Sequence, residues 1–312
     1  MNLFFSKKTF AGCIFTLVFL LLPAGCIPEK FSIPDKVPPC DAEKAEFYTA
    51  KSVSFGDRYS GSDAIRTYRT WIIKTLKEIP GVTVTTEEFT RMTPNGTLPF
   101  CNIIAEIPGN SPDHVITGAH YDTKRFSTFA FPGANDGASG VSALLLIAEN
   151  IAKCGVKLPY TLRLVFFDGE ECLVEYGEND GLHGSKYHAE NLHKNKSRCR
   201  AMILLDMIGD KDLCITPPRN SHPKLVSLLE KSASYLKKSS FTGKFAGEML
   251  DDHVPFMEKG IPSIDLIDFS YGPDNVFWHT PEDSLERISG KSIALASDLV
   301  IGMLFNIKKE GL

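Results

Sequence analysis

Apolar residues recur with two different periods along the chain, and these periods predict alternating helices and strands. A helix is predicted over residues 41–54. A second helix is predicted to begin after Ser62, because the apolar side chains that follow it recur every three or four residues, at Ile65, Tyr68, Ile72 and Leu76. Residues 82–91 and 102–107 resemble strands joined by a turn at residues 94–96, which predicts a hairpin at the edge of a sheet.

Four later segments are almost continuously apolar, which is typical of strands that are buried on both faces of a sheet. They are residues 115–119, 161–167, 201–207 and 263–267, and predicted helices over 138–152, 225–236 and 293–307 lie between or after them. This order predicts an α/β fold: a mixed, mainly parallel central sheet with helices on both faces. The chain contains no internal repeat, and we expect a single catalytic domain over residues 41–312.

The first 26 residues have the features of an export signal. Lys7 and Lys8 precede an apolar run over residues 10–22 that is shorter than the ~20 residues needed to span a bilayer. The segment that ends at Cys26 resembles a bacterial lipoprotein cleavage box. We therefore expect a protein of the bacterial cell envelope that is lipid-anchored through Cys26, with simple secretion as the alternative. The proline-rich residues 27–40 are predicted to form an extended tether.

Composition and charge describe an ordinary folded protein. Of 312 residues, 43% are hydrophobic and 23% charged, and the formal net charge is −4. The absence of a basic block beyond the first ten residues disfavours nucleic acid as a partner. Beyond the predicted signal and anchor there are six cysteines, which are compatible either with three disulfides or with six buried thiols: Cys40, Cys101, Cys154, Cys172, Cys199 and Cys214.

Histidine and acidic residues follow the predicted buried strands, where α/β sheets bind their ligands. They are His120, Asp122, Asp136, Glu170, Glu171, Asp206 and His279. Taken singly, each has an ordinary explanation, such as a structural histidine, a helix cap or a solvated acidic pair. Together they form the set of nitrogen and oxygen donors that suits Zn²⁺. Because Glu170 and Glu171 are successive, one can bind metal while the other acts as a base.

The motifs that contain these residues, taken in order, resemble the zinc aminopeptidase and glutaminyl cyclase superfamily. The similarity covers about residues 40–310 and includes the segments 118–122, 133–136, 166–171, 205–206, 251–256 and 278–280. It implies a zinc-exopeptidase-like three-layer sandwich. It also implies zinc ligands at Asp136, Glu171 and His279 and a general base at Glu170. His120 and Asp206 match the residues that complete a second metal site in two-zinc aminopeptidases.

Within that superfamily, the chain resembles the animal-type glutaminyl-peptide cyclotransferases. The resemblance lies in an insertion over residues 172–183 and in the segments 120–126, 251–253 and 278–279. It implies one zinc ion and conversion of the N-terminal glutamine of peptides or proteins to pyroglutamate, with release of ammonia. Asp251 would hold the substrate amide, and Asp206 would steady Glu170. Trp278 would form an apolar wall for the substrate, although an aromatic core residue is a second explanation.

Two other functions remain open from the sequence. One is a two-zinc aminopeptidase, in which Glu170 activates a metal-bound water and His120 with Asp206 holds the second ion. The other is a surface lipoprotein that binds peptides without catalysis. His188 and His193 are predicted to lie on a surface helix and are assigned to no site. The natural substrate and the oligomeric state are not defined by the sequence.

Overall fold

The computed structural model describes residues 30–192, 197–243 and 247–312. The predicted signal peptide, the anchor Cys26, the start of the tether and His193 lie outside these ranges. Residues Phe31–Leu312 form one compact unit.

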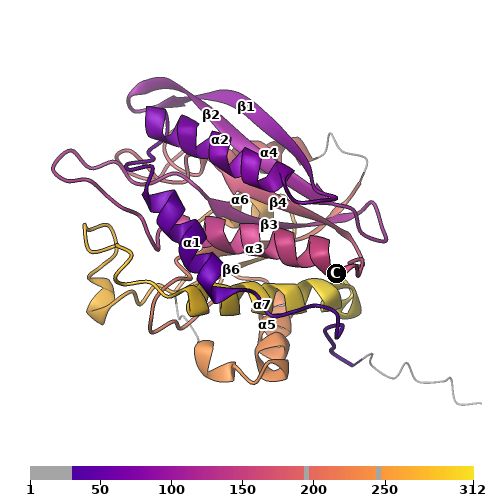
Figure 1. Cartoon of the computed structure of the whole chain (residues 1–312). Helices are drawn as coiled ribbons and strands as arrows, with labels where there is room; N and C mark the ends of the chain where they lie inside the picture. Colours follow the sequence, from indigo (N-terminus) through magenta and orange to yellow (C-terminus); the bar gives the residue numbers. More distant parts are fainter. Residues whose placement is uncertain (1–29, 193–196, 244–246) are drawn as a thin grey trace, which may run out of the picture. The chain divides into compact units, whose positions relative to one another are not determined.

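The centre of this unit is a six-stranded sheet with the order β1-β2-β4-β3-β5-β6 (Figure 1). The strands are β1 (Thr83–Thr93), β2 (Gly96–Ile107), β3 (His114–His120), β4 (Thr161–Phe167), β5 (Cys199–Asp206) and β6 (Ser263–Ile267). The β1–β2 and β2–β4 pairs are antiparallel, whereas β4, β3, β5 and β6 run parallel to one another. The predicted mixed, mainly parallel sheet is confirmed.

The edge hairpin also forms, with Thr93 paired to Gly96 across a two-residue loop. Strand β2 begins six residues earlier than the sequence predicts, because Pro99 is accommodated inside it. Pro99 lies opposite Thr90 of β1, while β4 pairs with β2 only from Ile103 onward. Pro99 therefore has no strand on its β4 side to which a backbone N–H would have to donate. Proline is tolerated in sheets at such positions.

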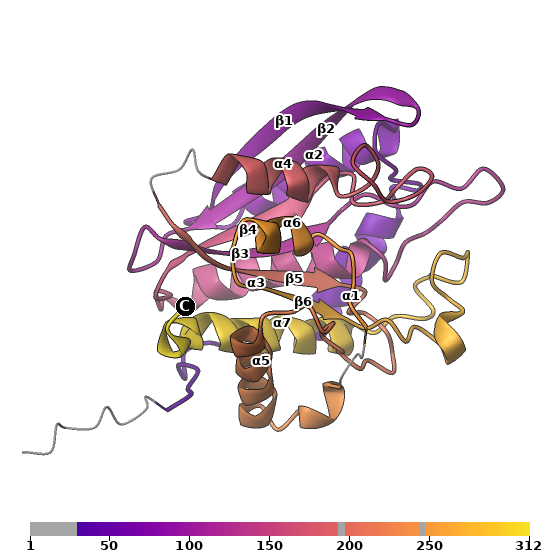
Figure 2. The ribbon, with the colours of Figure 1, turned by 180° about the vertical axis from the view of Figure 1, so that it is seen from behind.

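Helices cover both faces of the sheet and complete three layers (Figures 1 and 2). The main core is formed by side chains of α1 (Ala42–Val53), α2 (Asp63–Lys77), α3 (Ala138–Cys154), α5 (Pro223–Tyr235) and α7 (Gly290–Asn306). The smaller core on the opposite face contains Ala189 of α4 (His183–Asn191) and Phe256 of α6 (Val254–Glu258). The expectation of helices on both faces is thus confirmed.

Strand β4 shows why the central strands are apolar at nearly every position. Leu162, Leu164 and Phe166 join the main core, while Val165 and Phe167 join the smaller core. Successive side chains of a strand point to opposite faces, so a strand covered on both sides is apolar at nearly every position. The exception among residues 162–167 of β4 is Arg163, whose guanidinium donates to the carboxylate of Glu106.

Helix α4 is a surface helix whose inner side is packed on the sheet. His188 is only 2% exposed. Its Nδ1 lies 2.9 Å from the carboxylate of Glu87 on β1. The polar sequence of this helix did not indicate that His188 is buried, with one ring nitrogen paired to a distant strand and Nε2 without a hydrogen-bond partner.

The described part of the predicted tether, residues 30–40, lies against the domain from Phe31 onward. Ser32 exchanges two backbone hydrogen bonds with the Asn306 side chain, and the Cys40 amide donates to Asp298 of α7. Phe31 and Ile33 pack against the main core. This proline-rich segment is therefore held on the surface of the domain by side chains of α7.

None of the six cysteines beyond the signal and anchor is paired in the structure. Cys101, Cys154 and Cys172 are buried and the other three are half-buried. The sequence left open three disulfides or six buried thiols. The structure has six free thiols, of which three are only half-buried.

In the described part of the chain, one helical segment, Gly290–Glu310, has the length and apolar composition of a membrane span. The window that qualifies is 83% buried inside the structure. Its apolar character is accounted for by its place in the main core, where α7 packs against α1, α3 and α5.

Candidate active site

The carboxyl ends of the parallel strands meet at one edge of the sheet, and the polar residues singled out in the sequence gather there. Strand β3 ends at His120 and β5 ends at Asp206. Strand β4 ends just before Asp168 and leads into Glu170 and Glu171. This edge of an α/β sheet is where ligands bind, because the loops that follow the strands surround it.

Asp136, Glu171 and His279 form a first group of potential metal ligands. The Nε2 atom of His279 lies 3.3 Å from Asp136 Oδ2 and 3.2 Å from Glu171 Oε1. His279 has a positive φ of 57°, which is uncommon for a residue with a side chain. Such backbone strain is characteristic of functional sites, where the surroundings impose the conformation. The Trp278 ring is half-buried and stacks on the His279 ring at a centroid distance of 4.0 Å.

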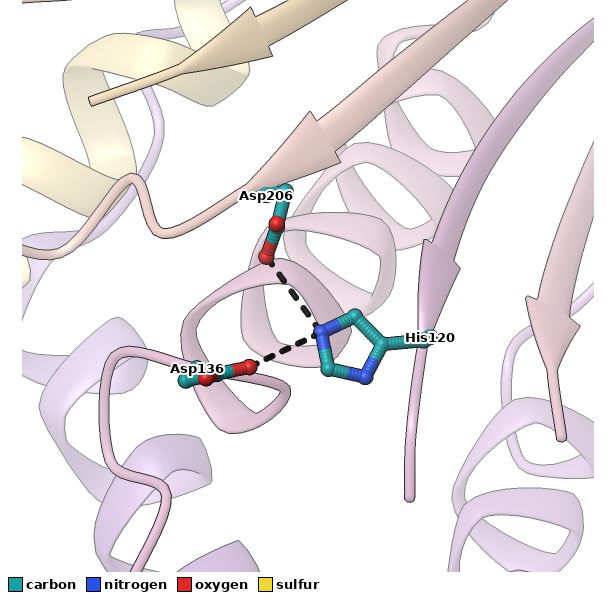
Figure 3. Close-up of side chains that lie close together, drawn as sticks. All are labelled: His120, Asp136 and Asp206. Atoms are coloured by element: carbon teal, nitrogen blue, oxygen red, sulfur yellow. Dashed lines mark hydrogen bonds and ion pairs between the residues drawn. The ribbon is translucent and has the colours of Figure 1, made fainter. Parts of the chain in front are cut away.

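His120, Asp136 and Asp206 form a second group, shown in Figure 3. The Nε2 atom of His120 lies 3.2 Å from Asp136 Oδ1 and 3.3 Å from Asp206 Oδ1. Asp136 belongs to both groups, with one carboxylate oxygen toward each histidine. The structure thus brings together all five residues that the sequence singled out as potential ligands.

The donor set fits a zinc ion. Imidazole nitrogen and carboxylate oxygen are ligands that Zn²⁺ prefers, and three protein ligands with an open position are typical of catalytic zinc. Glu171 Oε2 is buried without a hydrogen-bond partner and has Lys124 Nζ at 3.6 Å. Burial opposes the charge of His279, but its hydrogen bonds to Asp136 and Glu171 outweigh burial and raise its pKa to about 10. These carboxylates therefore favour a cation between them.

The loop that carries the two glutamates is fixed by Asp122, which the sequence groups with the potential donors but does not assign as a zinc ligand or a base. Its carboxylate accepts the backbone N–H of Glu170 at 3.1 Å and that of Glu171 at 3.2 Å. It also lies 3.7 Å from His120 Nδ1. Its position two residues after a histidine at a strand end was the available signal, because both side chains then reach the same edge of the sheet.

Asp283 does the same for the loop that carries Asp136. Its carboxylate accepts the backbone N–H groups of Asn135 and Asp136 at 2.7 and 3.1 Å, and the hydroxyl of Tyr271 at 3.0 Å. Burial, followed by the nearby charge of Asp136, raises the pKa of Asp283 to about 7. No sequence pattern indicated this residue, since it joins segments almost 150 positions apart.

Glu170 is buried and belongs to neither ligand group. Its Oε1 accepts a hydrogen bond of 2.9 Å from the hydroxyl of Tyr176, which lies in the insertion after Glu171. Burial, followed by the charge of Glu171, raises the pKa of Glu170 well above its ordinary value. A carboxyl group with a raised pKa is suited to take up and release a proton near neutral pH.

Asp251 belongs to a third buried cluster, together with His253 and Asp265. Burial and the charge of Asp206 raise the pKa of Asp251, and burial and the charge of Asp251 raise that of Asp265. Burial also lowers the pKa of His253 to about 4. Asp251 lies close enough to Glu170 for its charge to act on that residue. Asp206 contacts His120 at 3.3 Å, and its support of Glu170 stays a prediction.

Comparison with known proteins places this geometry in a family. The model of peptidase family M28 matches residues 102–304, which include His120, Asp136, the two glutamates, Asp206 and His279. The chain belongs to peptidase family M28. The match begins within β2 and ends within α7, so it contains all four parallel strands of the M28 fold and the loops that follow them.

Within this family, the chain is similar in sequence to a curated relative and in structure to two solved proteins. It is 30% identical over 259 residues to the glutaminyl-peptide cyclotransferase-like protein of Bos taurus, covering 73% of this chain and 66% of the relative, slightly under two thirds. The crystal structure of an Acidobacteriales bacterium glutaminyl cyclase has a TM-score of 0.82 and 30% identity, over 88% of this chain and 97% of that one. A Zn-dependent exopeptidase from Parabacteroides distasonis has a TM-score of 0.77 and 27% identity, over 86% and 99%.

The solved neighbours confirm the zinc-exopeptidase-like fold expected from the sequence. The recognised similarity to glutaminyl cyclases within a zinc peptidase family is confirmed as well. Zinc is the metal that the exopeptidase neighbour and the ligand groups indicate.

Proposed function

We propose that the protein is a zinc-dependent glutaminyl-peptide cyclotransferase, an acyltransferase that acts on peptides or proteins with an N-terminal glutamine. The observation that carries this proposal is the buried Glu170, which stands beside the ligand group Asp136, Glu171 and His279 without belonging to it. The similarity to a bovine cyclotransferase-like protein and to a bacterial glutaminyl cyclase supports the same activity.

One zinc ion is proposed, held by Asp136, Glu171 and His279. When bound, it would supply Lewis-acid polarisation of the γ-carbonyl of the substrate glutamine. The reaction forms a bond between the α-nitrogen and the γ-carbon and breaks the bond from that carbon to the amide nitrogen. Glu170 takes the proton that the α-amine loses and gives it to the departing nitrogen, which leaves as ammonia.

The remaining residues would orient the substrate. Asp251, fully buried and within electrostatic reach of Glu170, would hold the amide nitrogen. Asp206 would steady the site from the end of β5. The half-buried Trp278 ring, stacked on His279, offers an apolar face to the glutamine side chain.

A two-zinc aminopeptidase is the second candidate, and the His120, Asp136 and Asp206 group favours it. Asp136 offers one oxygen to each group, so a second ion would share that carboxylate. Glu170 would then activate water for cleavage of the first peptide bond. A peptide-binding protein without catalysis is the weaker explanation, since every ligand and the base are present.

The test is ammonia release from a peptide that begins with glutamine, by the zinc-loaded protein and by its Glu170→Gln variant. We expect release by the wild type and a loss of at least about 100-fold in kcat for the variant, the usual contribution of a general acid–base group. Zinc content measured on the same samples should stay unchanged. An active Glu170→Gln variant would contradict the proposed role of Glu170.

We also propose that the protein is exported and attached to a membrane of the bacterial cell envelope through lipidated Cys26. The support is the sequence of residues 1–26 alone. Incorporation of labelled fatty acid into the protein tests this proposal. We expect incorporation in the wild type and none in Cys26→Ser. A wild-type protein that carries no lipid contradicts it.

A further inference from the structure

The insertion over residues 172–183 is a built loop that places one side chain against Glu170. Asp180 fastens it, because its carboxylate accepts the backbone N–H groups of Leu173, Val174 and Glu175 at 2.6, 2.8 and 3.0 Å. Gly177 donates its backbone N–H to the Asp180 carbonyl at 2.9 Å. A loop with this many internal bonds holds its own shape rather than relying on a bound substrate.

The loop is also tied to the elements on either side of it. The backbone N–H of Leu182 donates to the carbonyl of Glu170 at 2.9 Å. Lys186 of α4 donates its ammonium to the carbonyls of Gly177 and Gly181 at 2.6 and 3.0 Å. The tip of the insertion is therefore fixed relative to Glu170.

Tyr176 is the side chain of this loop that turns inward. Val174 is 75% exposed, whereas Tyr176 is half-buried and its hydroxyl lies 2.9 Å from Glu170 Oε1. The ring rests on Gly181, where an added Cβ would come within 2.5 Å of it. Lys124 Nζ lies 5.8 Å from the ring centroid. These contacts fit one orientation of the ring.

We propose that Tyr176 is a positioning residue for the reaction, an inference that rests on the proposed function. Its hydroxyl donates to Oε1 and fixes the rotation of the Glu170 carboxyl group. The other oxygen, Oε2, then carries the proton from the α-amine to the leaving nitrogen. The reasoning is geometric: a glutamate side chain has three rotatable bonds, and proton transfer requires the carboxyl group to stay within hydrogen-bond reach of both nitrogens.

Tyr176→Phe tests the inference, because it removes the hydroxyl and retains the ring that rests on Gly181. With the zinc-loaded protein and a peptide that begins with glutamine, we expect kcat to fall by about tenfold or more, as for loss of a hydrogen bond to a charged group. KM should stay within about twofold, since substrate contacts are unchanged. Zinc content and the thermal unfolding midpoint should match those of the wild type.

Tyr187→Phe is the matched control. Tyr187 lies on α4, just beyond the same loop, and its ring stacks on Phe89 at 4.1 Å, a contact that phenylalanine keeps. This variant should retain the wild-type kcat.

Three results would overturn the inference: an unchanged kcat in Tyr176→Phe, a rise in KM alone, or a loss of zinc in proportion to activity. A rise in KM alone would make Tyr176 a substrate-binding residue. A wild-type protein that releases no ammonia refutes the proposed function and this inference with it. An active wild type with an equally active Tyr176→Phe refutes the inference alone.

Discussion

Asp122 should be essential for the shape of the site although it belongs to neither ligand group. Its buried carboxylate accepts the backbone N–H groups of both glutamates, at 3.1 and 3.2 Å. Asp122→Asn retains the volume of the side chain but only one acceptor oxygen, because the amide nitrogen can only donate. The backbone N–H of either Glu170 or Glu171 would then be buried and face the amide N–H₂ group, which is also a donor.

The magnitude follows from that count. A hydrogen bond to a charged group contributes about 1.5–3 kcal/mol, so Asp122→Asn should lower the free energy of unfolding by about that amount. Asp122→Ala removes both bonds and should cost about 3–6 kcal/mol, a large part of the ~5–15 kcal/mol by which domains are stable. Because the backbone of Glu170 shifts, kcat should also fall by as much as about 100-fold in Asp122→Asn.

The assay is equilibrium unfolding in urea of the zinc-loaded variants, followed by their kinetics. The exposed Asp212 provides the control, and Asp212→Asn should stay within about 0.5 kcal/mol of the wild type. An Asp122→Asn protein with an unchanged urea midpoint and unchanged kcat would refute the reasoning.

Three further outcomes are expected. Gly140→Ala should destabilise the domain by about 1–3 kcal/mol in urea unfolding, because the new Cβ would lie 2.6 Å from the Leu205 carbonyl. Burial, then Arg163, lowers the pKa of His114 to about 3, so the unfolded chain binds more protons as pH falls below 6.5. His114 alone should therefore cost the folded state about 2 kcal/mol between about pH 6.5 and about pH 5, a loss that His114→Gln should not show. Chelation of zinc should lower the thermal unfolding midpoint, and added zinc should restore it.

Each of these outcomes has a control. Gly177→Ala, whose Cβ would meet nothing closer than 3.9 Å, should be nearly neutral, and equal stabilities for the two alanine variants would contradict the packing argument. An identical pH dependence in His114→Gln and wild type would show that another group titrates. An unfolding midpoint that is insensitive to chelator would argue against a bound metal.

The sheet and the ligand residues could be predicted because their signals are local. A strand buried on both faces is apolar at nearly every position, as residues 162–167 of β4 are apart from Arg163, and the ligands follow such strands directly. Parallel strands then bring those residues to one edge of the sheet without any further information. The order of the motifs along the chain was therefore enough to predict the metal site.

The residues that hold the site in place could not be predicted in the same way. Asp283 acts on Asn135 and Asp136, and Tyr176 acts on Glu170, through contacts that the folded chain alone creates. The burial of His188 could not be predicted either, because its partner, Glu87, lies about 100 residues away. Hydrogen-bond partners distant in sequence leave no periodic pattern, and the free state of the cysteines likewise depends on their positions in space.

The most direct test of the account is the product that the zinc-loaded protein makes from two peptides, one beginning with glutamine and one with leucine, identified by mass. The account predicts loss of one ammonia from the glutamine peptide, absent in Glu170→Gln, and an intact leucine peptide. Release of free leucine with no loss of ammonia would contradict the cyclase and identify a two-metal aminopeptidase.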